Sequence, residues 1–94
     1  MDEITHRRDG HRGAFVIDRA GRTLAELAYT VGGAVVILEH TEVDSALRGT
    51  GAGARLVKAA VEWARAEKKQ LMPLCPFAKS VFDKTPDYGD VLKK

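Results

Sequence analysis

A glycine-rich segment between a strand-like run and a helix-like run is the feature that most constrains this fold. It reads LRGTGAGA over residues 47–54, behind an apolar run over 34–43 and ahead of an amphipathic run over 55–67. Glycine adopts positive φ and lets the backbone approach a ligand closely. The first turn of a helix adds free N–H groups at the positive end of its dipole. The segment therefore predicts a site for phosphate groups that needs no lysine.

From the residues alone, three other interpretations of the same segment have to be compared. A P-loop is excluded because no lysine follows the glycines. A dinucleotide-binding fingerprint matches locally over residues 49–54, but that motif belongs in the first βα unit of a parallel sheet, whereas the chain before it has hairpin signals. The third interpretation is a plain strand-to-helix connection that binds no ligand.

Hairpin and helix signals define the remaining elements. Strands are predicted over residues 3–8, 12–17, 23–31, 34–43 and 70–75, helices over 55–67 and 77–84, and a last helical turn over 86–89. Gly32-Gly33 favours a two-residue hairpin turn with positive φ at both glycines. The predicted fold class is α+β: a mixed, mostly antiparallel sheet of about five strands, with one main helix after the glycine segment and short C-terminal helices.

Composition limits the classes of function. The chain has 94 residues, which predicts a single domain over 1–94. Its net charge of +2 argues against a broad nucleic-acid surface. Cys75 is the only cysteine, so we expect no internal disulfide and a reducing compartment. No apolar run has the length of a signal peptide or a membrane span, so we expect a cytoplasmic protein without nucleic-acid or membrane partners. No metal site is predicted.

Motifs along the chain resemble one family of enzymes. Arg48-Gly49-Thr50-Gly51-Ala52-Gly53 fits the R/Q-x-x-G-x-G/A motif of the GCN5-related N-acetyltransferase (GNAT) superfamily, and Val43 fits the strand end before it. His40-Thr41-Glu42-Val43, Pro73-Leu74-Cys75-Pro76-Phe77 and Pro86-Asp87-Tyr88 more narrowly resemble its small single-domain, YjdJ-type branch, related to the NATD1-like proteins. The resemblance covers nearly the whole chain and implies a minimal GNAT fold, with a V-shaped opening between the central strands.

The resemblance implies an acetyl-CoA-dependent N-acetyltransferase whose acceptor is an amine on a small molecule or a protein. The family holds the pyrophosphate of acetyl-CoA in the glycine turn and pairs the pantetheine arm with the preceding strand. The implied cofactor residues are Val43, Arg48, Gly49, Thr50, Gly51, Ala52, Gly53 and Cys75. Two helices that usually help to shape the acceptor pocket are absent, so we expect an acceptor side that is open or completed by a partner.

The alternative function is a non-catalytic module that binds or senses acyl-CoA. The family's usual acid is a tyrosine in the helix after the second of the two parted strands, and Phe82 falls where that tyrosine is expected. Phenylalanine has no proton to give, and Tyr88 is the candidate substitute. Turnover separates the two functions, because both bind the cofactor.

His40 and Glu42 are the candidate general bases. Strand alternation puts them on one face with Leu38, and puts Thr41 and Val43 on the other face. An amine must lose a proton to be acetylated, and a carboxylate or imidazole beside the cofactor turn suits that task. Polar residues at a strand end are also commonly solvated or paired across strands.

Cys75 is the third candidate for the chemistry. It ends a predicted strand between two prolines and precedes a helix, a setting that lowers the pKa of a thiol. It is either a nucleophile that accepts the acetyl group or a residue that lines the acetyl pocket. A buried cysteine that behaves as a small hydrophobic residue is the alternative.

Overall fold

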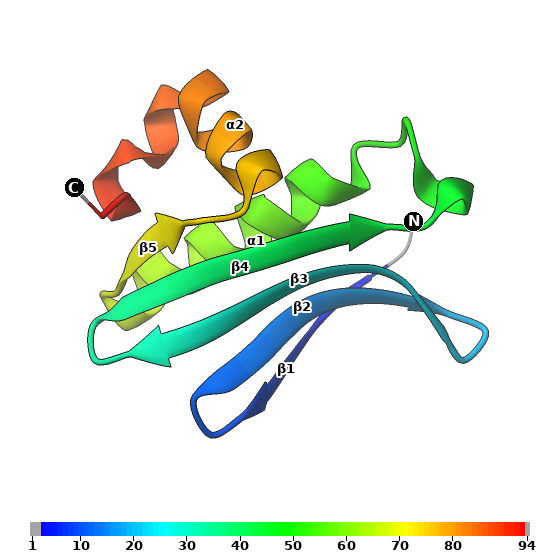
Figure 1. The fold of residues 1–94 in the computed structure, drawn as a ribbon, viewed down its shortest axis with the longest axis horizontal. Coiled ribbons are helices and arrows are strands. Elements are labelled where there is room, and N and C mark those ends of the chain that lie inside the picture. Colours follow the sequence, from blue (N-terminus) through cyan, green and yellow to red (C-terminus); the bar gives the residue numbers. More distant parts are fainter. Residues whose placement is uncertain (1–2, 94) are drawn as a thin grey trace.

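Five strands form one sheet in which neighbours in space are also neighbours in the chain (Figure 1). The computed structural model describes residues 3–93. The elements are β1 (Ile4–Asp9), β2 (Arg12–Arg19), β3 (Arg22–Gly32), β4 (Val35–Val43), the 3-10 helix η1 (Ser45–Leu47), α1 (Ala52–Glu67), β5 (Gln70–Pro73), α2 (Pro76–Lys84) and the 3-10 helix η2 (Pro86–Val91). β1 to β4 pair antiparallel, whereas β4 and β5 run parallel with α1 as their crossover. The predicted α+β class is confirmed.

The bounds of the elements differ from the predicted ones by one to three residues, and two of these differences affect the site. α1 begins at Ala52 rather than at residue 55, because Gly51 is its N-cap, with a left-handed φ of 80°, and the helix follows at once. β5 ends at Pro73 rather than at residue 75, because Leu38 O accepts the N–H of Cys75 as well as that of the residue before it. The parallel ladder therefore stops early, which matters for the site below.

The turn between β3 and β4 differs from the prediction by one residue. Gly32 pairs with Val35, so Gly33 and Ala34 form the loop. Gly33 has a φ of 62°, whereas Gly32 is not among the glycines with positive φ. A type II′ turn needs positive φ only at its first central residue, which is the place of Gly33. The expectation of positive φ at both glycines was therefore wrong.

A β-bulge in β4 changes which side chains share a face. Ala28 pairs with His40 but Tyr29 pairs with Leu38, so Glu39 has no partner of its own in the ladder. The extra residue shifts the alternation of the strand. Leu38 consequently lies on the same face as the buried Tyr29, and its predicted place on the face of His40 was wrong.

α1 packs on one face of the sheet through small and branched side chains. Leu56, Val57, Ala60, Val61 and Ala64 of α1 are fully buried. Each large side chain in this interface contributes about 1.5–3 kcal/mol by leaving water, and the alanines let the helix approach the strands closely. The opposite face of the sheet carries no helix within residues 3–93 (Figure 1). No helix of this part of the chain has the length and apolar content that a membrane span requires.

An aromatic group joins the edge strand β1 to the core. Phe15 and Tyr29 have ring centroids 5.9 Å and 5.1 Å from that of Trp63 in α1. His6 of β1 stacks on Phe15 at 4.2 Å, and its Nε2 lies 2.5 Å from the Tyr29 hydroxyl. The Tyr29 ring and hydroxyl lie too close to leave room for a Cβ on Gly13, so the position requires glycine.

We expect His6 to make the stability of the protein depend on pH. Burial, followed by the charge of Arg8, lowers the pKa of His6 from its ordinary value of 6.5. The unfolded chain then binds more protons than the folded one, so this contribution is complete above pH 6.5 and is lost as the pH falls. Thermal melts from about pH 8 to about pH 5 should show a falling melting temperature, and His6→Phe, which keeps the stacking, should flatten the fall. An equal fall in both proteins would contradict this role.

Candidate functional site

An opening between β4 and β5 begins where their pairing stops. The parallel ladder ends with Leu38 opposite Pro73. Leu38 O also accepts the N–H of Cys75 at 3.1 Å, as the chain turns away into α2. Within residues 3–93, no strand lies on this side of β4 from Glu39 to Val43. The backbone of this free edge is available to pair with an extended ligand.

The glycine segment follows η1 at the end of β4. Asp44 begins η1 by accepting the Ala46 N–H on its side chain at 2.9 Å. Gly49 and Gly51 have φ of 78° and 80°, which residues with a side chain rarely adopt. The N–H of Arg55 donates to Gly51 O at 3.0 Å and makes the first hydrogen bond of α1. The N–H groups of the preceding helical residues are therefore directed at the space in front of the helix.

A groove of about 450 Å³ joins the glycine segment to the opening. It is lined by Thr41, Val43, Leu47, Arg48, Gly49, Gly51, Ala52, Gly53, Ala54 and Phe77. At one end, backbone donors, the dipole of α1 and the guanidinium of Arg48 suit phosphate groups. Beside this phosphate end, Thr41 and Phe77 offer a less polar surface that suits an uncharged arm. The groove thus fits an extended molecule with a phosphate at one end.

Cys75 lies behind the groove, against Thr41. Its side chain is only 5% exposed, and its thiol donates to Thr41 Oγ1 at 3.4 Å. Burial opposes ionisation of this thiol, but the hydrogen bond with Thr41 and those from the backbone N–H groups of Ala78 and Phe77 outweigh it. The pKa of Cys75 is consequently lowered. A thiol with a lowered pKa at a helix N-terminus is suited to nucleophilic attack.

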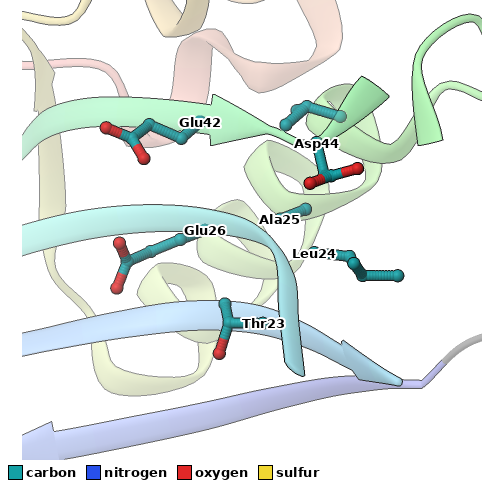
Figure 2. Close-up of a pocket in the computed structure, with 7 residues that line it drawn as sticks. Thr23, Leu24, Ala25, Glu26, Glu42 and Asp44 are labelled. Carbon is teal, nitrogen blue, oxygen red and sulfur yellow. The ribbon is translucent and has the colours of Figure 1, made fainter. Parts of the chain in front are cut away.

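A second pocket, of about 300 Å³, lies at the ends of β3 and β4 (Figure 2). Glu26 and Glu42, which line it, are direct partners in the ladder, and Figure 2 shows their carboxylates extending from adjacent strands in the same direction. His40 Nε2 lies 3.9 Å from Glu26 and 4.0 Å from Glu42. Like charges directly opposite one another across strands repel. This arrangement therefore attracts a positively charged group.

The structure separates the predicted catalytic residues into two sets. Cys75 lies with Thr41 on the side of the sheet that faces α1. The ladder places His40 and Glu42 opposite Ala28 and Glu26, which alternate with the buried residues of β3, so both point away from α1. The free edge of β4 lies between the two sets.

Most of the predicted cofactor residues line the groove. Val43, Arg48, Gly49, Gly51, Ala52 and Gly53 line it. Cys75 lies directly behind its Thr41 wall. Thr50 is not among the lining residues, because its Oγ1 turns back and donates to Leu47 O at 2.6 Å.

Sequence reasoning missed three residues of these surfaces. Thr41 was placed on a face but given no role, and Phe77 was noted only as part of a motif. Glu26 lies on the strand before the candidate bases, and only the register of the β3–β4 hairpin shows that it opposes Glu42. The Gly33 turn and the bulge at Glu39 set that register, so periodicity alone could not reveal the pair.

A family model and a solved structure match most of this chain. The family model, described as GCN5-related N-acetyl-transferase, matches residues 14–91. A GCN5-like candidate N-acetyltransferase from Staphylococcus aureus, solved by NMR, is 33% identical with a TM-score of 0.73, and the match covers 99% of this chain and 91% of that one. No protein of curated function matches the chain in sequence.

Larger acetyltransferases share the fold over part of their length. Nourseothricin acetyltransferase is 27% identical with a TM-score of 0.55, and the match covers 67% of this chain and 39% of that enzyme. The aminoglycoside N-acetyltransferase AAC(6')-Iy, solved in complex with CoA, is 18% identical with a TM-score of 0.58, over 81% of this chain and 67% of that one. The chain therefore corresponds to a part of these enzymes.

Proposed function

Since this chain belongs to the GCN5-related N-acetyltransferase family, we propose that it transfers the acetyl group of acetyl-CoA to a cationic amine that approaches from the open face of the sheet. Family membership makes the chain an acetyltransferase that uses acetyl-CoA. The observation that carries the finer proposal is the groove, which leads from the start of α1 along the free edge of β4 to Thr41, and the Cys75 thiol lies against Thr41 behind it.

The donor would lie along this groove. Arg48 and the N–H groups at the start of α1 would hold its pyrophosphate, and the backbone of β4 up to Val43 would pair with the pantetheine arm. The proposed cofactor residues are Val43, Arg48, Gly49, Thr50, Gly51, Ala52, Gly53 and Cys75. The donor supplies an activated acetyl thioester. The fit rests on the φ of the two glycines, the start of α1 directly after Gly51 and the residues that line the groove.

Cys75 is the proposed nucleophile. Its ionised sulfur attacks the acetyl carbonyl, the bond between the carbonyl and the CoA sulfur breaks, and the CoA thiolate takes up a proton from water. The amine then attacks the acetyl-cysteine and displaces the Cys75 thiolate, while its proton passes to a base. His40 and Glu42 are the proposed bases, because they lie on the side from which the amine would come.

The charge of the open face supports a cationic acceptor. Glu26 and Glu42 oppose one another, and Asp44, which lies 3.5 Å from the Arg22 guanidinium, lines the same pocket. The pocket is open to solvent, since no helix of residues 3–93 covers this face. A protonated amine would relieve the repulsion between the carboxylates and bring its proton within reach of His40.

We expect a Glu26→Gln, Glu42→Gln double variant to raise the KM for a cationic amine by about tenfold, with little change for an uncharged one. Release of CoA thiol from acetyl-CoA, measured with a panel of polyamines, lysine peptides and neutral amines, tests this. A Glu62→Gln, Glu67→Gln double variant, which removes the same two charges from exposed positions of α1, is the control. Tight binding of acetyl-CoA with no thiol release above hydrolysis would instead favour a module that only binds acyl-CoA. Preference for neutral amines would refute the cationic acceptor.

A further inference from the structure

Phe77 is an exposed aromatic residue at the start of α2 that reaches across to the start of α1. It is 41% exposed and lines the groove together with Thr41 and Val43. The residue before it, Pro76, is the first of α2, and Cys75 is the N-cap of that helix. The ring therefore forms a wall of the groove between the glycine segment and the thiol.

The tip of the Phe77 ring rests on Gly53. A Cβ added to Gly53 would lie 2.6 Å from Cζ and 2.7 Å from Cε2 of the ring, which is closer than carbon atoms can approach. Gly53 is inside α1 and has no positive φ, unlike Gly49 and Gly51. Its backbone conformation therefore suits any residue, and the ring is what requires a glycine there.

We infer that Phe77 is a positioning residue that sets the width of the cofactor groove, and that Gly53 leaves space for its ring rather than serving as an approach point for phosphate. This inference rests on the proposed function, because it assigns the groove to CoA. The flat ring packs against the pantetheine arm, whose methyl groups and amides have no charge to solvate. Seated on Gly53, the ring holds that arm between itself and the free edge of β4, with the thioester end toward Cys75.

The contacts of Gly53 predict what a methyl group added there would do. Only the tip of the Phe77 ring meets a Cβ added to Gly53, so the ring can move away from Gly53 without disturbing the backbone. Alanine also suits a helix better than glycine does. Gly53→Ala should therefore leave the melting temperature nearly unchanged. The displaced Phe77 ring should change the width of the groove.

The test is a double-mutant cycle of Gly53→Ala and Phe77→Leu, measured by calorimetric titration with CoA. We expect Gly53→Ala to weaken CoA binding about tenfold in the natural background and by less than about twofold in the Phe77→Leu background, because the shorter leucine leaves room for the methyl group. Gly89→Ala is the control, since that glycine has ordinary φ, open space around it and a place outside the groove.

The outcomes separate this inference from the function it rests on. A similar loss from Gly53→Ala in both backgrounds, or no loss in either, would overturn the role of Phe77 while leaving CoA binding intact. A wild-type protein that does not bind CoA would overturn both. A large fall in the melting temperature of Gly53→Ala would assign the contact to folding instead.

Discussion

Cys75→Ala should lower acetyl transfer by on the order of a thousandfold, while acetyl-CoA still binds within about threefold of the wild-type affinity. The reason is that the variant loses the sulfur that accepts the acetyl group, but keeps the glycine segment and the free edge of β4. The measurement is single-turnover release of CoA thiol, together with the intact mass of the protein after mixing with acetyl-CoA. Wild type should gain the mass of one acetyl group, and Cys75→Ala should gain none.

Thr41→Val provides a second variant for the same claim. It removes the hydroxyl that hydrogen-bonds to the Cys75 thiol and keeps a side chain of similar shape. The pKa of the thiol should then rise, and the pH profile of the acetylation step should move to higher pH. Transfer within about threefold of wild type in Cys75→Ala would contradict a covalent intermediate and leave direct attack of the amine on acetyl-CoA.

Gly51→Val should abolish CoA binding, with a loss of affinity of about a hundredfold or more. Gly51 has a φ of 80° as the N-cap of α1, which valine adopts only with strain, and its side chain would enter the groove. Calorimetric titration with CoA measures the loss.

Gly21→Val is the matched control for that variant. Gly21 has a φ of 78° in the turn between β2 and β3, with open space around it, and lies outside the groove. The two variants share the same backbone strain, about 1–2 kcal/mol of stability. Gly21→Val should therefore lose stability but keep its affinity for CoA. Retained affinity in Gly51→Val would place the cofactor elsewhere.

Much of this fold could be predicted because its signals are local. The alternation of Ala25, Leu27, Tyr29 and Val31 predicted a half-buried strand, and those residues are buried in β3. The spacing of apolar residues after the glycine segment predicted the helix that became α1. The order of strand, glycine turn and helix start likewise predicted a phosphate site, and this segment forms the phosphate end of the groove.

The remaining features depend on pairing between strands. The bulge that separates Leu38 from the face of His40 inserts one residue, and no local pattern marks it. The same register opposes Glu26 to Glu42, so the acidic pocket emerges only when the hairpin is closed.

Contacts between distant elements were also beyond the reach of sequence patterns. Gly53 reads as one more glycine of the motif, yet the Phe77 ring fills the space where its side chain would be. The Cys75 thiol meets Thr41 because the β4–β5 ladder ends at Leu38. Periodicity places a residue on an element, whereas these pairs depend on how separate elements meet in the folded chain.

Calorimetric titration of the wild-type protein with CoA, acetyl-CoA and NAD in parallel is the most direct test of the claim that the groove is a CoA site. We expect CoA and acetyl-CoA to bind one site per chain and NAD not to bind, because the groove offers a free strand edge for a pantetheine arm behind the phosphate end. Binding of NAD, or no binding of either CoA form, would contradict this claim and leave the glycine segment as a dinucleotide site or a plain connection.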